Sequence, residues 1–185
     1  MESRNVLIIG GSRGAGAEAV RRFSAAGDKV VFTYHRSELE ADDLRQETGA
    51  VPVRCDVKFS NSVRIAAEKA LKILGYVDVL ICCASTSDSD LITEIEETRW
   101  EEVIDTNLNG VFYCIKNILP LMIQRGQGTI ITVAPGWSRV EDSPGTACAA
   151  AGAGIMGLTK ALASEVAPSG IMVRCITPDM LETVF

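Results

Sequence analysis

Short apolar runs alternate along the chain with longer stretches whose apolar residues recur every three or four positions. The apolar runs predict β-strands at 5–10, 29–34, 50–57, 77–84, 128–134 and 171–177. The three- and four-residue periodicity predicts helices at 17–27, 37–49, 60–74, 98–124 and 146–167. The run at 77–84 is apolar enough to indicate a strand that is covered on both faces.

This strict alternation of strands and helices fixes the expected fold class. Parallel strands that are joined by right-handed helical crossovers form a sheet with helices on both of its faces. The chain has 185 residues, a common length for one domain, and it contains neither an internal repeat nor a low-complexity linker. We therefore expect a single α/β domain over residues 1–185, with a doubly wound parallel sheet.

Composition and charge limit which partners the chain is expected to bind and where in the cell it is expected to lie. Hydrophobic residues make up 47% of the chain and charged residues 23%, which is typical of a globular protein. The net charge of -6 provides no broad basic surface for nucleic acid or for an anionic membrane. No run approaches the roughly 18 apolar residues of a membrane span, and the first residues do not resemble a signal peptide. A cytoplasmic protein is the expectation.

The cysteines and the histidine bear on redox state and metal binding. Six cysteines lie in predicted strands and helices without CxxC spacing, as is typical of buried thiols in a reduced compartment. His35 is the only histidine. The pattern therefore favours neither a disulfide framework nor a zinc site, and we expect no metal cofactor.

A glycine-rich loop follows the first predicted strand. Gly10, Gly14 and Gly16 form a GxxxGxG pattern between that strand and the first helix. Glycines at this turn let the backbone approach a pyrophosphate at a helix N-terminus. Alternatively, the glycines only mark a strand-to-helix turn. Because the loop opens a chain that alternates throughout, we interpret it as a dinucleotide-binding loop.

The end of the second strand distinguishes the two nicotinamide dinucleotides. NAD-binding proteins usually carry a carboxylate there, whereas NADP-binding proteins supply a cation for the 2′-phosphate. Residues 34–37 read Tyr-His-Arg-Ser and contain no acid. Arg36, together with Arg13 of the glycine loop, can form a charge-assisted clamp on a phosphate. NADP(H) is the predicted cofactor; NAD(H), with Arg36 merely solvated, is the alternative.

Several motifs in order along the chain resemble the short-chain dehydrogenase/reductase family, in particular its 3-oxoacyl-[acyl-carrier-protein] reductase-like members. They are GGSRGAG at 10–16, CDV at 55–57, DTNLNGVF at 105–112, GTIITV at 128–133, GLTKALASEVAPSGIMV at 157–173 and TPDMLET at 177–183. The resemblance covers residue 5 to the C-terminus and implies a Rossmann-type fold.

The resemblance also implies roles for individual residues. Asp56 should receive the adenine amino group, with Val57 beside the ring, and Asn107 should hold a water of the proton relay. The remaining implied cofactor contacts are Gly10, Ser12, Arg13 and Ala15 at the phosphates, Cys83, Ala84 and Ser85 under the ribose, and Pro178 in the segment that matches the family's later Pro-Gly. Without the family, Asn107 is a polar residue in a helix with a structural role.

The positions that carry the family's catalytic residues differ here. The resemblance implies a tyrosine and a lysine four residues apart on the helix after strand five, where this chain has Cys148 and Gly152. The family's serine at the end of strand five aligns with Pro135. A thiol is much shorter than a phenol, and glycine supplies no cation to lower a donor's pKa. We expect a catalytically impaired member that acts as a nucleotide-binding or partner subunit.

Two other interpretations remain at this point. The chain could be a working NADP-dependent carbonyl or 3-oxoacyl reductase that uses non-standard groups, with Asn107 and Cys148 as the nearest candidates and Ser138 or Ser143 as further ones. Alternatively, only the scaffold remains and the cofactor is no longer bound. Titration with NADPH and an assay of NADPH oxidation distinguish the three.

The resemblance has consequences for assembly. Family members commonly pair through the helices at 98–124 and 146–167, and the small residues of ACAAAGAGIMG suit close helix packing. We expect a homodimer or homotetramer, or a complex with a different protein. Family members also continue into substrate-covering helices and a last strand, which we expect this chain to lack.

Overall fold

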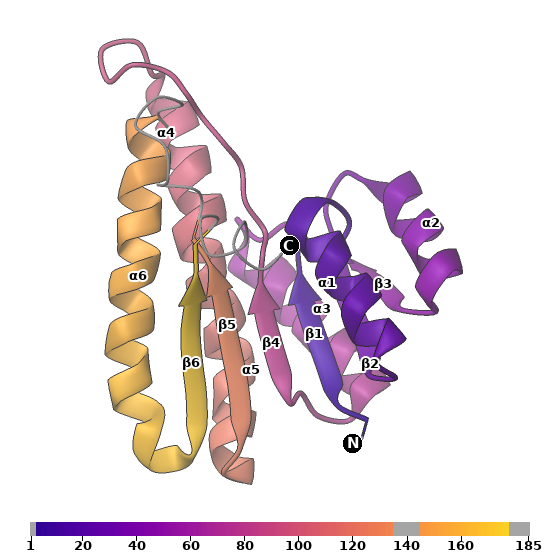
Figure 1. Ribbon diagram of the computed structural model, residues 1–185. Helices are drawn as coiled ribbons and strands as arrows, with labels where there is room; N and C mark the ends of the chain where they lie inside the picture. The colour runs from indigo at the N-terminus through magenta and orange to yellow at the C-terminus, as the bar shows by residue number, and fades with distance from the viewer. Residues whose placement is uncertain (1–2, 135–144, 178–185) are drawn as a thin grey trace.

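The computed structural model describes residues 3–134 and 145–177, which form one layered α/β domain (Figure 1). The strands are β1 (Asn5–Ile9), β2 (Lys29–Tyr34), β3 (Val51–Arg54), β4 (Val79–Cys82), β5 (Gly128–Val133) and β6 (Ile171–Ile176). The helices are α1 (Gly14–Ala25), α2 (Glu38–Thr48), α3 (Ser60–Leu74), α4 (Glu97–Ile104), α5 (Gly110–Arg125) and α6 (Thr146–Val166), with the short helical turns η1 (Asp105–Asn109) and η3 (Ala167–Ser169).

All six strands form one parallel sheet in the order β3-β2-β1-β4-β5-β6. The first strand is therefore central, and the chain builds outward on one side before it crosses to the other. The strand order reverses between β1 and β4, and in such sheets ligands bind at the carboxyl ends of the strands beside this switch point. The fold class expected from the sequence is confirmed.

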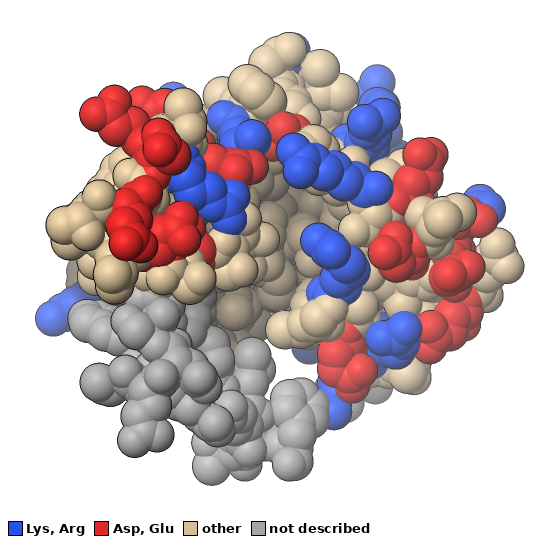
Figure 2. Space-filling model, turned by 90° about the horizontal axis from the view of Figure 1, so that it is seen from above, with Lys and Arg blue, Asp and Glu red and all other residues tan. Residues whose placement is uncertain are grey.

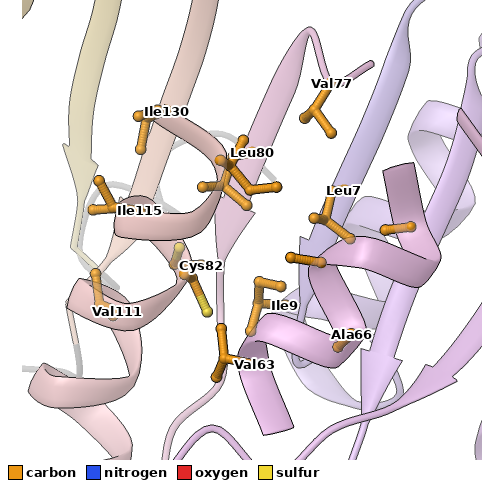
Figure 3. Packing of buried hydrophobic residues seen from close by; sticks show 14 of the residues in the cluster. Leu7, Ile9, Val63, Ala66, Val77, Leu80, Cys82, Val111, Ile115 and Ile130 are labelled. Atoms are coloured by element: carbon orange, nitrogen blue, oxygen red, sulfur yellow. The ribbon is translucent and has the colours of Figure 1, made fainter. Parts of the chain in front are cut away.

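Alternating residues of β1 explain why helices cover both faces of the sheet. Leu7 and Ile9 belong to a buried cluster that includes residues of α3, α5 and α6, whereas Val6 and Ile8 belong to another with residues of α1 and α2. Figure 3 shows Leu7 and Ile9 near side chains of the helices on the first face. Successive side chains of a strand point to opposite faces, so a strand that is apolar throughout becomes buried on both.

The long helix predicted at 98–124 contains a break in its hydrogen-bond pattern. The structure divides it into α4, the π-helical turn η1 and α5, and the residues at both junctions keep right-handed helical dihedrals. A π-turn inserts one residue into a helix and often marks a functional site. Here it contains Asn107, so the break shifts this side chain relative to a regular helix.

Helix α6 is more hydrophobic than we expected from its sequence. Over Thr146–Ser169 the best 18-residue window has a mean hydropathy of 1.3 and is 33% buried, so this helix is long and apolar enough to cross a membrane by composition. The expectation that no run approaches this limit is therefore wrong for this helix, because its alanines together with Ile155, Met156 and Leu158 raise the average. Core helices of soluble proteins pass the same test, and α6 packs against β6, α4 and η1.

Candidate cofactor and catalytic site

The glycine loop between β1 and α1 packs directly against the end of β4. A Cβ on Gly10 would lie 2.5 Å from the Ala84 Cα, and Gly10 has a φ of +79°, which side chains rarely adopt. A Cβ on Gly16 would lie 2.2 Å from the Gly10 carbonyl oxygen. The buried Thr33 supports the loop, because its Oγ1 accepts a hydrogen bond from the Gly10 N–H at 3.0 Å. Only glycine fits at these two positions.

Helix α1 begins at Gly14 and presents an N-terminus with free hydrogen-bonding capacity. Its N-cap, Arg13, makes no side-chain capping bond, and the first turn contains no acidic residue. The first N–H groups of a helix lack partners within the helix, and the helix dipole favours negative charge there. This geometry suits a phosphate group.

A pocket of about 520 Å³ opens beside this loop, at the carboxyl ends of the strands. Its walls come from the glycine loop, the segments after β2, β3 and β4, and the η1 region. Every predicted cofactor residue within the described part of the chain lines this pocket: Gly10, Ser12, Arg13, Gly14, Ala15, Gly16, Arg36, Asp56, Val57, Cys83, Ala84 and Ser85. Pro178 lies outside the described residues.

Basic side chains border the hollow at this end of the molecule (Figure 2). Arg13, Arg36 and Lys58 line the pocket, and His35 joins them from the segment after β2. The His35 Nε2 lies 3.3 Å from the Asp56 Oδ2, and the Lys58 N–H donates to the Asp56 Oδ1 at 3.1 Å. The side chains of Arg13, Arg36 and Lys58 outnumber the two carboxylates that line the same pocket, Asp56 and Glu102, which favours an anionic ligand.

An ion-pair chain connects this basic rim to the opposite wall of the pocket. The Lys58 Nζ lies 3.5 Å from the Glu102 Oε1, and Arg99 pairs with Glu102 from the adjacent turn of α4. Arg99 and Lys58 hold the pKa of Glu102 below its usual range, the Arg99 hydrogen bond being the main cause. Arg99 also donates to the Thr86 Oγ1 at 3.3 Å and to the Ser87 carbonyl.

The cysteines under the pocket are neutral thiols. Burial, together with the neighbouring Cys82, raises the pKa of Cys83 to about 12. A hydrogen bond to Cys82, together with burial, raises the pKa of Cys114 well above its usual value. Both thiols therefore stay protonated at neutral pH, and Cys83, which lines the pocket, adds no charge to it.

Asn107 binds the backbone of the segment that follows β4. Its Oδ1 accepts the Thr86 N–H at 2.8 Å, and its Nδ2 donates to the Thr86 carbonyl at 2.9 Å. The residue is 1% exposed and belongs to the π-turn. These two bonds fix Thr86, which lines the pocket. The water-holding role implied by the family resemblance stays a prediction.

Cys148 lies in the first turn of α6 and faces away from open solvent. It is 2% exposed and packs with Val103 and Ala147. Its Sγ accepts the Asp88 N–H at 3.3 Å and lies 3.8 Å from the Thr86 carbonyl oxygen. The thiol is thus engaged with the backbone of the 86–88 segment, and it is not among the residues that line the pocket.

The other two catalytic positions supply no visible functional group. Gly152 is buried one helical turn after Cys148, also away from the pocket lining. Pro135, together with the alternative candidates Ser138 and Ser143, falls between the two described ranges of the chain. Among described residues, no group of three or more His, Cys, Asp or Glu side chains could hold a metal ion.

A model of the short chain dehydrogenase family matches residues 4–185. The chain belongs to this family. Curated relatives of this dehydrogenase-family chain include the 2-dehydro-3-deoxy-L-rhamnonate dehydrogenase (NAD(+)) of Sphingomonas sp. (strain SKA58), 30% identical over 97% of this chain and 73% of the relative. The 3-oxoacyl-[acyl-carrier-protein] reductase FabG of Chlamydia pneumoniae is 33% identical over 97% of this chain and 74% of the relative.

Solved structures that resemble this chain show the same architecture. A metagenomic short-chain oxidoreductase in complex with NADP superposes with a TM-score of 0.87 at 26% identity, covering 95% of this chain and 82% of that one. The protein gox2181 gives a TM-score of 0.87 at 26% identity, covering 96% of this chain and 72% of that one. The chain is therefore a member of a family of NAD(P)-dependent oxidoreductases.

Several residues at the site were not among the sequence predictions. They are Thr33, Lys58, Thr86, Asp88, Arg99, Glu102 and Thr106. Lys58 directly follows the Asp56-Val57 pair and could have been found from that position. Arg99 and Asp88 act through contacts between segments that no periodicity or motif of this sequence connects.

Proposed function

We propose that this chain binds NADP(H) in the pocket at the carboxyl ends of β1, β2, β3 and β4, and that it lacks the family's usual hydride-transfer catalysis. In this role it acts as a nucleotide-binding or partner subunit. NADP(H) would supply or accept the hydride in a working family member. Here the chain's own residues bind and orient the dinucleotide.

The preference for NADP(H) rests on charge at the pocket. Arg13 and Arg36 both line it, and no carboxylate follows β2 before the start of α2. Hydrogen bonds from an arginine to a phosphate are charge-assisted and are often bidentate, so this pair favours a 2′-phosphate over a free hydroxyl. His35 lies beside them and is held near Asp56.

The observation that carries the proposed loss of catalysis is the environment of Cys148. Its thiol accepts a backbone N–H from Asp88 and is buried, so it is neither long enough nor free to reach a substrate oxygen in the pocket. Gly152 provides no ammonium group. A positioned acid–base group contributes about 10²- to 10⁴-fold to a rate, so carbonyl reduction should be slower by at least that factor.

The proposal is tested by measuring binding and turnover separately. Thermal unfolding is followed at increasing NADPH and NADH, and NADPH oxidation is followed with acetoacetyl thioesters and simple aldehydes. At 100 times the dissociation constant, a bound cofactor adds about 2.7 kcal/mol of stability, which is about 5–10 °C in Tm for a chain of this size. We expect this shift with NADPH at lower concentrations than with NADH, and no turnover above background.

Other outcomes would identify the alternative functions. Turnover that Cys148→Ala abolishes would show a working reductase that uses non-standard groups. A Tm that is unchanged by saturating NADPH and NADH would show that only the scaffold remains. Cys175→Ala is a matched control, because it removes a thiol that does not line the pocket.

We also propose that two copies of the chain pair through α4, α5 and α6. Phe112 and Ile123 of α5 are exposed at 45% and 43%, and the exposed positions of α6 include Ala150, Ala153 and Gly157. Apolar and small residues on adjacent helices suit close helix packing. Light scattering should give a dimer or tetramer mass, and Ala153→Glu together with Gly157→Glu should give a monomer.

A further inference from the structure

Helix α6 lacks the usual features that satisfy a helix N-terminus. It contains 21 residues, its N-cap is Gly145 with no side-chain capping bond, and its first turn contains no acidic residue. A helix of this length has a partial positive charge at its N-terminus, and an acidic side chain placed there stabilises it. Position 148, where the family's proton donor stands, lies in this first turn.

Asp88, from the segment after β4, lies against this helix end. A Cβ on Gly145 would be 2.7 Å from the Asp88 Oδ2 and 2.8 Å from the Asp88 carbonyl oxygen. That carbonyl accepts the Gly145 N–H at 2.7 Å. A residue larger than glycine at 145 would therefore push the carboxylate away from the helix.

The carboxylate of Asp88 is otherwise poorly satisfied. Its side chain is 4% exposed, and the Oδ2 has no hydrogen-bond partner in the part of the chain that the structure describes. The Arg99 Nε lies 3.6 Å from the Oδ1, which is an ion-pair distance and too long for a hydrogen bond. A buried charge needs a compensating positive potential, and the end of α6 together with Arg99 provides it.

We infer that Asp88 is a positioning residue: it supplies from another segment the negative charge that the N-terminus of α6 lacks, and it thereby fixes Cys148 and the 86–88 segment at one end of the pocket. The same segment is tied to the pocket wall, because Asn107 holds Thr86 and Arg99 contacts both Thr86 and Glu102. Cofactor binding at that wall and order at the end of α6 are therefore coupled. This last step rests on the proposed binding of NADP(H).

The inferred role of Asp88 is tested by how fast the Cys148 thiol reacts with an alkylating reagent. Purified protein is treated with iodoacetamide, and the alkylation of Cys148 is followed over time by peptide mass spectrometry. Asp88→Asn keeps the size of the side chain but removes its charge. We expect Cys148 to be alkylated about tenfold faster in this variant, from the typical strength of a charge at a helix end. Asp90→Asn, an exposed acid two residues later, should match the wild type.

A second pair of variants tests the contact from the side of the helix. Gly145→Ala should displace the carboxylate and expose Cys148 as Asp88→Asn does. Thr146→Ala is its control, because it changes an exposed residue in the same first turn of α6. Adding Asp88→Asn to Gly145→Ala should then cause little further change, whereas two independent structural defects would add.

The cofactor is introduced in the last measurement. Saturating NADPH should slow Cys148 alkylation in the wild type and lose most of this effect in Asp88→Asn, while the NADPH-induced Tm shift persists in both. Equal alkylation rates in the wild type and in both Asp88→Asn and Gly145→Ala would overturn the role of Asp88. No Tm shift with NADPH would instead overturn the proposed cofactor binding, and the alkylation rates without cofactor would still test Asp88.

Discussion

Two neighbouring regions differ in what they retain: a binding end, at the glycine loop and the ends of β2 and β3, and a catalytic end, at the end of β4 and the start of α6. At the binding end, the side chains that line the pocket are those that we propose to hold the dinucleotide. At the catalytic end, the positions that align with the family's tyrosine and lysine carry a buried thiol, Cys148, and a glycine, Gly152. Side chains there form hydrogen bonds with the backbone of the 86–88 segment. Under the proposed function, binding and catalysis in this fold depend on different segments, so that one set of residues is replaced while the other is kept.

The largest effect is expected from rebuilding the catalytic end. The triple variant Pro135→Ser, Cys148→Tyr, Gly152→Lys should oxidise NADPH with a carbonyl substrate about 10²- to 10⁴-fold faster than the wild type. The reason is that a phenol and an ammonium one turn apart restore the proton donor and the cation that lowers its pKa. Steady-state absorbance at 340 nm measures the rate.

Cys148→Tyr alone is the control for this variant. Position 148 is buried, so the larger side chain should lower stability by about 1–3 kcal/mol without raising the rate. If the triple variant binds NADPH and stays folded but gains no activity, the difference between the two ends lies in more than these three residues.

The next largest effect concerns the binding end. Arg36→Glu should weaken NADPH binding by about ten- to hundredfold, since a charge-assisted bond to phosphate is lost and a like charge is placed beside it. NADH binding should change much less. Isothermal titration with both dinucleotides measures the ratio, and Arg45→Glu on the exposed side of α2 serves as a control for added negative charge. Equal losses for both dinucleotides would contradict a 2′-phosphate site.

A moderate effect is expected where the two ends meet. Asn107→Ala removes two hydrogen bonds from the partly buried backbone of Thr86 and leaves its carbonyl with only the weak contact from the Cys148 thiol. Unfolding free energy should fall by about 2–3 kcal/mol, and urea titration measures it. Asn117→Ala, which removes one bond between side chain and backbone on the same helical segment, should cost less.

The smallest effect lies far from both the binding end and the catalytic end. Arg4 holds the pKa of Asp28 below its usual value, mainly through its side-chain hydrogen bond. A lowered folded-state pKa contributes stability above the unfolded pKa, and this contribution is lost as the pH falls through the folded value. Asp28→Asn should therefore cost about 0.5–1 kcal/mol at pH 7 and progressively less toward pH 3, with NADPH affinity unchanged. Thermal unfolding across this pH range tests the sign.

Much of the fold could be predicted because each strand carries its own signal. The runs at 30–34 and 129–133 consist of apolar, aromatic or β-branched residues, and the structure places strands there. The break at η1 could not be found from periodicity, since a π-turn inserts one residue without changing which residues are apolar. At the site, glycines and arginines were recognised from their positions in motifs.

The residues that the sequence did not reveal act between segments. Asp88 touches Gly145 at a distance of 57 positions along the chain, and neither residue has a local pattern that points to the other. Arg99 likewise contacts Thr86 and Ser87 across the connection between β4 and α4. Such contacts follow from how the crossovers bring loops to the same edge of the sheet.

The central place of β1 in the sheet bears on how the chain is made. Of the six strands, β1 leaves the ribosome before the others, and β2 can pair with one of its edges as soon as residues 29–34 emerge. Its other edge stays open until residues 79–82 are synthesised, because only β4 pairs there. During that interval a nascent chain presents an apolar strand with unpaired backbone groups, the kind of surface that chaperones bind and that aggregation uses.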